Sequence, residues 1–561
     1  MENNTRGKEY DVIVIGGGAT GAGTARDCAM RGLKTILIER LDFTAGATGR
    51  NHGLLHSGAR YAHTDPESAA ECIKENIILK KIARHCIDDT GGLFVTLPED
   101  SLSYQDAFVE DCGKAGIDVD VLDPKEARLM EPSVNPDIIG AVKVPDASVD
   151  PFRLTTANIM SARHYGADIL TYHEVVGFEK EGNRIIGVDL LDRKTCERST
   201  VYGKVIINAC GIWGHLVAKL AGVNVNMYPA KGSLLIFGHR INHMVLNRCR
   251  KPGDADILVP GDTICVIGTT STRIPFDQID NMEVTPGEVD LLLREGTKLS
   301  PALAYTRILR AYCGVRPLVA DDKDPTGRSI SRGIVCLDHA KRDGLEGFIT
   351  ITGGKLMTYR LMAQEATDMA CRKLGVDKPC MTAEVPLPGS EPTADDKKRR
   401  QHIIELSTEQ KAAEGRHGSM TSFIKSGSPD DDALVCECEQ VSVAEVNYAI
   451  DELHVNNLIN LRRRTRMGMG TCQGELCACR AAGLIDRHYN CTQKSLDDLA
   501  SFMNERWHGM FPVCWGETLV EVQFTSWLYR GVLGIDHEPD SHEENIDNNV
   551  ANAETCKKEK S

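Results

Sequence analysis

The stretch IGGGATGAGTARDCAMRG, at residues 15–32, follows the apolar run YDVIV and decides the fold. Gly16, Gly18 and Gly21 have the G-x-G-x-x-G spacing that binds a dinucleotide pyrophosphate between a strand and a helix. The first glycine permits a tight turn, the second lets the pyrophosphate approach the backbone, and the third lets the helix pack closely on the strand. The helix start adds free N–H groups and a positive dipole end. This predicts a buried parallel strand at 10–15 and a Rossmann-like α/β domain.

An acidic residue closes the next predicted strand. LKTILIE ends in Glu39, whose carboxylate is suited to accept hydrogen bonds from a ribose hydroxyl. Arg40 follows it and leaves NADP open as an alternative. The loop TAGATGRNHGLLHSGARY (44–61), which includes Thr48 and Asn51, is too polar and glycine-rich for a core element. Such a loop is suited to wrap the flavin end of FAD, with a plain surface loop as the alternative, and we expect FAD.

Two later strands also end in glycine. KVIINACGIW (204–213) contains Gly211, and GFITITGGKLMTYRLMAQEA (347–366) contains Gly353 and Gly354. Both strands are expected to bring backbone close to the cofactor. The helix after Gly354 would begin near the flavin C2 carbonyl, where negative charge builds during hydride uptake, so its dipole would be favourable.

The composition limits the class of function. The chain has 561 residues and a net charge of −15, which argues against nucleic-acid binding because such proteins carry a basic surface. We expect no export signal, since MENNTRGKEYD lacks an apolar segment, and no membrane span, since no run of about 18 apolar residues occurs. The 20 cysteines should therefore be reduced, and most stand singly in apolar runs as inert thiols.

Five cysteines near the C-terminus are grouped: Cys436, Cys438, Cys472, Cys477 and Cys479. Ser442 and Glu445 predict a capping box that opens a helix between the first two and the last three. Another helix is expected to begin at Cys477. Four thiolates near the N-termini of two helices can bind one cluster or one ion. The run LRRRTR (461–466) would either offset the negative charge of a cluster or form a solvated or docking face.

Several motifs carry a family resemblance. GGGATGAG, NHGLLHSGARY, NACGIW, AKGSLLI, GVRPL and TGGKLMTYR resemble the FAD-dependent glycerol-3-phosphate dehydrogenases, within the D-amino-acid-oxidase-like flavoproteins. With the C-terminal cysteines included, the resemblance is to the anaerobic, quinone-linked branch. It implies FAD, sn-glycerol 3-phosphate as donor and dihydroxyacetone phosphate as product.

The same resemblance implies partners and a location. The expected assembly is an A/B/C-like complex, in which this chain joins a second flavoprotein-type subunit, and an iron–sulfur subunit docks the whole on the membrane. The chain would then be peripheral at the cytoplasmic face of the inner membrane, with quinone reached through partners and any FMN entering through the complex.

The resemblance assigns roles to charged residues. Arg60 and Tyr61 match the loop that binds the substrate phosphate, and Arg332 matches a further phosphate contact by a looser motif. Arg316 matches the arginine beside the reacting carbon, and Lys355 the lysine at the flavin–substrate junction. The chemistry is consistent, because a phosphate dianion calls for several Arg or Lys, and an arginine beside a developing alkoxide lowers the barrier.

Alcohol oxidation also needs a base for the hydroxyl proton, a task for which histidine is easily tuned at neutral pH. His56 matches the histidine suspected of this role, and the alternative is that it only orients flavin or substrate. The rival enzyme is an amine, opine or amino-acid dehydrogenase, for which one arginine would suffice to bind a carboxylate.

The cysteine unit resembles the small ferredoxin domain associated with bacterioferritin, which binds a [2Fe–2S] cluster. The resemblance makes Cys436, Cys438, Cys472 and Cys477 the ligands, although the second pair is C-x4-C where that domain has C-x2-C, so Cys479 competes for a place. Structural zinc in a docking module and an empty, degenerate site are the alternatives. A cluster would suit a flavin enzyme, since flavin takes up a two-electron hydride and iron–sulfur centres carry single electrons.

The expected fold is α/β: a FAD-binding Rossmann-like domain of the D-amino-acid-oxidase/glutathione-reductase type with a substrate-capping antiparallel sheet, followed by a small α-rich ferredoxin-like domain. The expected segments are a tail (1–9), the oxidoreductase domain (10–385), a linker (386–432) with a short helix at 400–413, the cysteine domain (433–490), a helical segment (491–537) and a disordered tail (538–561).

Overall fold

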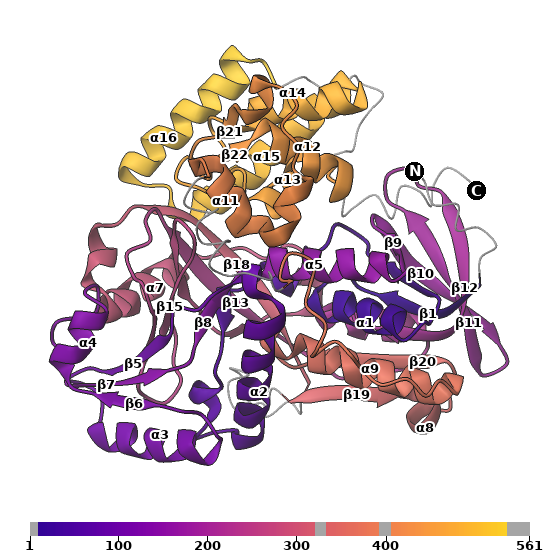
Figure 1. Ribbon diagram of the computed structural model, residues 1–561, viewed down its shortest axis with the longest axis horizontal. Coiled ribbons are helices and arrows are strands. Elements are labelled where there is room, and N and C mark those ends of the chain that lie inside the picture. The colour runs from indigo at the N-terminus through magenta and orange to yellow at the C-terminus, as the bar shows by residue number, and fades with distance from the viewer. Residues whose placement is uncertain (1–8, 320–332, 392–405, 536–561) are drawn as a thin grey trace.

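The computed structural model describes residues 9–319, 333–391 and 406–535, which form two sheet regions and a C-terminal group of helices (Figure 1). In the first sheet, β1 (Glu9–Ile15) lies parallel between β2 (Thr35–Ile38) and β12 (Arg198–Asn208). Val12 and Val14 pack against α1 (Ala19–Met30), whereas Ile13 and Ile15 belong to the core on the other face. The predicted strand is therefore buried on both faces, as parallel strands usually are.

The first sheet is completed by β9 (Asp168–Leu170), β10 (His173–Glu181), β11 (Arg184–Asp192), β19 (Ile334–Asp338) and β20 (Phe348–Gly353). Two further helices, α5 (Pro151–His164) and α9 (Tyr359–Leu374), pack on α1. Because β20 pairs with β12 in parallel, the carboxyl ends of β1, β12 and β20 meet at one edge. A Rossmann-like sheet binds its ligand at this edge.

The second sheet is centred on β13 (Tyr228–Phe237), which pairs antiparallel with β18 (Ile308–Leu318). Its other strands are β5 (Gly92–Thr96), β6 (Asp120–Leu122), β7 (Gly140–Val144), β14 (Val245–Arg248), β15 (Ile257–Pro260), β16 (Cys265–Gly268) and β17 (Thr272–Arg273). The helices of this region are α2 (Pro66–Ile82), α3 (Leu102–Lys114), α4 (Pro124–Met130) and α7 (Pro286–Leu299). All strand pairs here are antiparallel except β5 with β14, in agreement with the expected antiparallel sheet.

Shorter elements join these layers: β3 (Leu54–Leu55), β4 (Ile87–Asp88), β8 (Ala147–Val149), α6 (Gly214–Leu220) and α8 (His339–Asp343).

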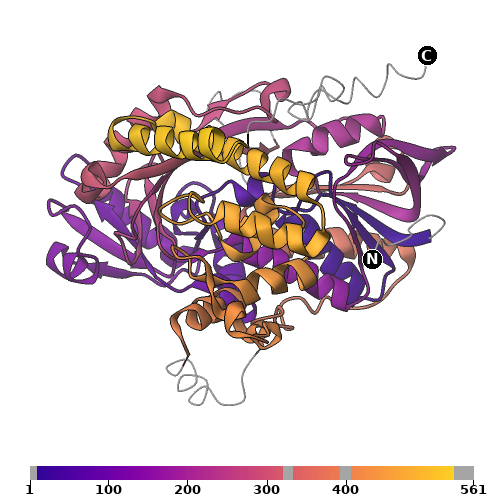
Figure 2. The same cartoon turned by 90° about the horizontal axis from the view of Figure 1, so that it is seen from above.

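The C-terminal helices have a core of their own and lie above both sheet regions (Figures 1 and 2). The elements are α11 (Thr408–His417), β21 (Leu434–Cys436), β22 (Val441–Ser442), α12 (Val443–Glu452), α13 (Leu458–Thr465), α14 (Ala478–Tyr489), α15 (Thr492–Met510) and α16 (Gly516–Ser526). Residues 400–405 of the helix expected at 400–413 lie outside the described residues; in the described part, α11 begins after the N-cap Ser407 and continues to His417. The expected tails at 1–9 and 538–561 lie outside the described residues, apart from Glu9 in β1.

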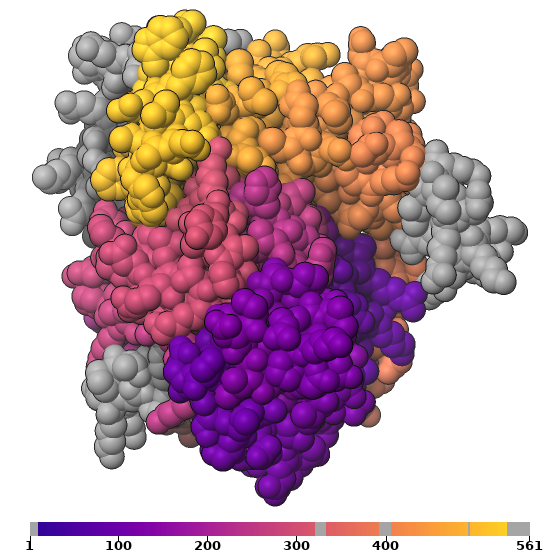
Figure 3. Space-filling view, turned by 90° about the vertical axis from the view of Figure 1, so that its left-hand side faces the viewer, coloured from indigo at the N-terminus to yellow at the C-terminus, as the bar shows by residue number. Residues whose placement is uncertain are grey.

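The C-terminal helices lie directly on the two sheet regions, as Figure 3 shows from one side. These regions (residues 9–319 and 333–391) are called the flavin domain below, because the flavin is expected there. Arg464 of α13 forms a buried ion pair with Asp42 at 2.7 Å, and Arg466 pairs with Asp150 at 3.3 Å. Arg310 of β18 pairs with Glu505 of α15 at 3.1 Å. Charge at this junction is therefore paired across the boundary between the two parts of the chain. No helix within the described ranges is long and apolar enough to cross a membrane.

Candidate active site

One pocket of about 1060 Å³ at the carboxyl edge of the first sheet gathers most of the residues singled out in the sequence. Its wall includes Gly16, Gly18, Glu39, Thr48, Asn51, His56, Arg60, Tyr61, Gly211, Arg316, Gly353, Gly354 and Lys355. These residues come from the ends of β1, β2, β12 and β20 and the loops after them, from the segment after β3, and from β18 of the second sheet. Arg332 lies outside the described residues.

The glycines of the first loop are required by close contacts. Gly16 has a φ of 111°, which favours glycine. A Cβ on Gly21 would lie 1.8 Å from the carbonyl oxygen of Gly16, so this residue fixes how closely α1 approaches β1. Gly18 is the N-cap of α1, and its missing side chain leaves the helix start facing Thr48, whose hydroxyl accepts the Ala19 N–H at 3.1 Å. Gly21 thus has a packing role and does not line the pocket.

The acidic residue after β2 lies against this loop. The Glu39 carboxylate accepts the N–H groups of Gly17 at 2.6 Å and Leu41 at 2.9 Å, and burial raises its pKa. Arg40 is held by Asp280 at 2.5 Å. Because this acid already neutralises Arg40, the residue is poorly placed to bind the extra phosphate of NADP, and the alternative left open by the sequence is not favoured.

The predicted histidine stands in a buried aromatic group. His56 is 6% exposed, and its ring lies edge-on to Tyr61 with 5.4 Å between centroids. The Lys355 ammonium lies 4.5 Å from the centre of the same Tyr61 ring. The structure therefore brings these three predicted residues together around one tyrosine.

Arg60 has an acidic partner that the sequence did not indicate. Its Nη2 donates to Asp256 at 3.0 Å, and Arg250 donates to the other oxygen of the same carboxylate at 2.8 Å. These two arginines lower the pKa of Asp256 against the effect of its burial. The Nη1 of Arg60 is buried and has no partner among the described residues. One edge of the guanidinium is thus held by protein, and the other is available to a ligand.

Arg316 is oriented by three consecutive residues. Its Nη2 donates to the Thr269 hydroxyl and the Thr270 carbonyl, the latter at 3.1 Å, and its Nη1 donates to Ser271 at 3.4 Å. Gly232 on β13 makes room for it, because a Cβ there would lie 2.7 Å from Nη2. None of these positioning residues was found in the sequence. Gly232 comes close to Arg316 through the β13–β18 register, which pairs Gly232 with Gly314, and a register of this kind is seen only in the structure.

The four predicted cysteine ligands lie together within the C-terminal helices (residues 406–535), which we call the C-terminal unit. Contacts from Cys438 and Cys477 lower the pKa of the Cys472 thiol, and contact with Cys477 lowers that of Cys436. The same contacts raise the pKa of the Cys438 and Cys477 thiols, so the protons are shared unevenly within the group. Within the described part of the chain, no group of three or more His, Cys, Asp or Glu side chains has the arrangement of a metal-ion site. Cys479 is exposed on α14.

Two of the four thiols, Cys436 and Cys472, have surroundings suited to thiolates. Backbone N–H groups of Gly468 and Glu439 hydrogen-bond to the Cys436 sulfur, and those of Leu476 and Gly474 to Cys472. Such donors stabilise charged sulfur and tune iron–sulfur sites. A Cβ on Gly470 would lie 2.4 Å from the Cys438 Cβ, so only glycine allows this approach.

The structure decides between the two alternatives for the arginine run. The run does not surround the thiols: Arg463 and Arg464 both pair with Asp42 of the flavin domain. It is a docking face, and its partner is the chain itself. The cations close enough for the thiolates to act on them are Arg307, Arg480 and Arg506, which come from separate elements.

The predicted capping box is corrected by the structure. The Ser442 hydroxyl accepts the Glu445 N–H at 3.2 Å as expected, but the Glu445 carboxylate does not return to the helix start. It accepts instead from Arg416 at 2.5 Å and from His417 at 2.8 Å.

Comparison with known proteins is consistent with this geometry. The sequence matches the DAO family, FAD dependent oxidoreductase, over residues 11–360. It is 62% identical over 527 residues to one chain of the anaerobic glycerol-3-phosphate dehydrogenase of Haemophilus influenzae, with 94% of this chain and 93% of the relative covered. The protein of the same name from Escherichia coli K12 is 60% identical over 531 residues, with 94% and 97% covered.

The fold has solved counterparts. The glycerol-3-phosphate dehydrogenase of Bacillus halodurans, solved with FAD, has a TM-score of 0.72 at 22% identity and covers 91% of this chain and 97% of its own. A glycine oxidase of Geobacillus kaustophilus has a TM-score of 0.53 at 20% identity and covers 65% and 95%. These likenesses show the fold, and the sequence identities show the family. The chain belongs to the anaerobic glycerol-3-phosphate dehydrogenase family of FAD-dependent oxidoreductases.

Proposed function

We propose that this chain oxidises sn-glycerol 3-phosphate to dihydroxyacetone phosphate in the pocket described above. The observation that carries the proposal is the convergence of a dinucleotide loop, a buried histidine and three cations, Arg60, Arg316 and Lys355, in one cavity. The names of the relatives at 60–62% identity support the same substrate.

The residues of the pocket fit FAD. The first loop is open where a Cβ would block a pyrophosphate, and the start of α1 and the Glu39 carboxylate are placed for phosphate and ribose. Thr48 and Asn51 line the loop beyond it, and Gly211, Gly353 and Gly354 bring backbone to the opposite wall. When bound, FAD would accept the hydride from the carbinol carbon.

The side chains of the pocket would have three separate roles: binding the substrate phosphate, stabilising the alkoxide and accepting the hydroxyl proton. The Nη1 of Arg60, together with Tyr61 and Lys355, would hold the substrate phosphate, with Arg332 as a further contact. Arg316, already oriented by Thr269 and Ser271, would stabilise the developing alkoxide. His56 would accept the hydroxyl proton at a ring nitrogen, and its burial would exclude competing water.

We further propose that Cys436, Cys438, Cys472 and Cys477 bind a [2Fe–2S] cluster. The proximity of the four thiols supports the proposal, and so do the backbone N–H donors that favour thiolates at Cys436 and Cys472. Bound there, the cluster would carry single electrons toward partner subunits and membrane quinone, with FMN supplied through the complex. The chain would be held peripherally at the inner membrane by a partner. Zinc in the same site remains the alternative that metal analysis decides.

The rival activity is oxidation of an amino acid or opine on the same flavin fold. Such a substrate has no phosphate, and one arginine would suffice for its carboxylate, so the set formed by Arg60, Arg316 and Lys355 would exceed what it needs. An anaerobic titration separates the two activities: glycerol 3-phosphate should bleach the oxidised flavin band, and amino acids or opines should not. The reverse result would refute the phosphate substrate. Iron and zinc analysis of the same sample tests the cluster.

A matched pair of variants tests the phosphate site. Arg60 and Arg250 both pair with Asp256, but only Arg60 lines the pocket. Arg60→Gln should raise KM for glycerol 3-phosphate at least about tenfold, and Arg250→Gln should leave it near the wild-type value. Equal effects in the two variants would mean that Arg60 acts only through Asp256.

A further inference from the structure

A second large cavity lies between the flavin pocket and the cysteines. It has a volume of about 1310 Å³ and shares wall residues Arg50, Asn51 and His52 with the first pocket. At its other end it reaches Cys438 and Gln473. We call it the junction cavity. Nothing in the proposed reaction uses this space, although it lies between the two sites that would carry electrons.

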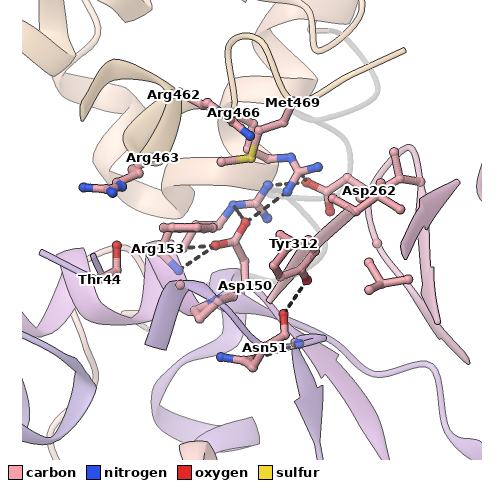
Figure 4. Close-up of a pocket in the computed structure, with 18 of the residues that line it drawn as sticks. Thr44, Asn51, Asp150, Arg153, Asp262, Tyr312, Arg462, Arg463, Arg466 and Met469 are labelled. Atoms are coloured by element: carbon pink, nitrogen blue, oxygen red, sulfur yellow. Dashed lines mark hydrogen bonds and ion pairs between the residues drawn. The ribbon is translucent and has the colours of Figure 1, made fainter. Parts of the chain in front are cut away.

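Arginines face one another across the junction cavity. Figure 4 shows Arg462, Arg463 and Arg466 on the C-terminal side and Arg153 on the flavin-domain side, with Asp150 between them. Most of these cations have acidic partners within the protein: Arg153 and Arg466 both pair with Asp150 and with Asp262. Their charge is largely compensated.

Arg462 is the exception. Its side chain is 13% exposed, and its nearest acid, Glu505, lies 3.9 Å away and is already paired with Arg310 at 3.1 Å. Burial, with Arg310, Arg463 and Arg466 nearby, lowers the pKa of Arg462 to about 9. A buried cation among like charges is costly unless an anion joins it.

Unmet hydrogen-bonding capacity accompanies this charge. Buried donor atoms at Arg462 Nε and Arg466 Nη2 have no hydrogen-bond partner among the described residues. Buried polar groups are almost always paired, and a set of unpaired guanidinium donors around one cavity calls for acceptor oxygens. A phosphate group offers several at once.

Part of the wall is apolar. Ile236, Val259, Ile264, Ile459 and Met469 line the cavity, and so does Tyr312. At about 1310 Å³ the cavity is much larger than a phosphate ion needs and exceeds the roughly 300–1,000 Å³ usual for organic ligands, so an organic group has room beside the phosphate. We propose that the junction cavity binds a phosphate-bearing aromatic ligand of mononucleotide size, with its phosphate on Arg462 and its ring against the apolar wall.

This inference concerns binding alone, so it stands or falls independently of the activity on glycerol 3-phosphate. The test uses the full chain saturated with FAD, which removes the first pocket from competition. FMN, AMP and inorganic phosphate are titrated separately, and bound ligand is measured by equilibrium dialysis. FMN and AMP should bind one per chain, more tightly than phosphate and more weakly at high salt.

Arg462→Met is the decisive variant, and Arg487→Met is its control, because Arg487 is an exposed arginine of α14 that does not line the cavity. The Arg462 change should weaken nucleotide binding at least about tenfold while FAD content and melting temperature are maintained, since it removes a poorly compensated charge. Equal binding in both variants, or no saturable binding of FMN or AMP, would overturn the proposal. So would an affinity for nucleotides no greater than for phosphate, which would indicate an adventitious ion only.

Discussion

Replacing Glu445 with glutamine should destabilise the C-terminal unit by about 3 kcal/mol at neutral pH. The Glu445 carboxylate is 0% exposed and accepts from Arg416 and His417. Arg416 in turn donates to the Glu439 carbonyl at 2.7 Å, beside Cys438. Despite its burial, Arg416 and His417 hold the pKa of Glu445 at about 2, against an ordinary 4.5. At about 1.4 kcal/mol per pKa unit, this difference gives the expected loss, which is also typical of removing one partner of a buried ion pair.

Urea unfolding followed by tryptophan fluorescence measures this loss. Three of the four tryptophans, Trp507, Trp515 and Trp527, lie in the C-terminal helices, so the signal reports on this unit. Glu452→Gln is the control, because Glu452 is exposed at the end of the same helix. A loss below about 1 kcal/mol in Glu445→Gln, or an equal loss in the control, would refute the reasoning.

The same pair predicts a pH dependence with a definite sign. The folded-state pKa of Glu445 is depressed, so its contribution is fully present above the unfolded pKa near 4.5 and is lost as pH falls toward 2. The stability difference between wild type and Glu445→Gln should therefore be constant from pH 7 to about pH 5 and fall to less than half by about pH 3. A difference that grows on acidification would contradict the assigned direction.

Three further predictions concern the flavin pocket and the thiols. Arg316→Ala should lower kcat about a hundredfold with a smaller change in KM, because its role is at the transition state, and an unchanged kcat in steady-state assays would contradict this. Gly21→Val should abolish FAD retention, measured as flavin released per chain, because the Gly16 carbonyl occupies the space that its side chain needs; retention at the wild-type level would show that α1 can shift. Cys472→Ser should leave flavin reduction by substrate intact and slow electron transfer to quinone in the reconstituted complex, whereas loss of FAD from this variant would show that the two parts fold together.

The dinucleotide site was predictable because its signals are local. Gly16, Gly18 and Gly21 stand within six positions. A Cβ on them would crowd the Ala209 carbonyl, the Thr48 hydroxyl and the Gly16 carbonyl, respectively. The later glycines, Gly211 and Gly353, converge on the same pocket because parallel strands end at one edge. That inference needs only the strand order of a Rossmann-like sheet.

The substrate side was accessible only through the family resemblance. Arg60 and Arg316 lie on different layers, and their positions depend on partners such as Asp256 and Thr269, which no local pattern connects to them. The capping box shows the same limit. Ser442-x-x-Glu445 is a sound local signal, yet the Glu445 carboxylate gains more from the cations of Arg416 and His417 than from one backbone N–H.

The arginine run shows why charge in a sequence cannot be assigned to a site without its partners. The run lies between Cys438 and Cys472, so proximity along the chain left both a role at the thiols and a docking face open. In the fold, α13 directs Arg463 and Arg464 toward Asp42, and the two arginines form ion pairs with that carboxylate.

The negative charge of a cluster would then be offset by Arg307, Arg480 and Arg506. Because Arg307 belongs to the flavin domain, electrostatic stabilisation of the cluster would depend on docking of the two parts. Separating them should therefore lower the reduction potential of the cluster, even if the cysteine unit stays folded.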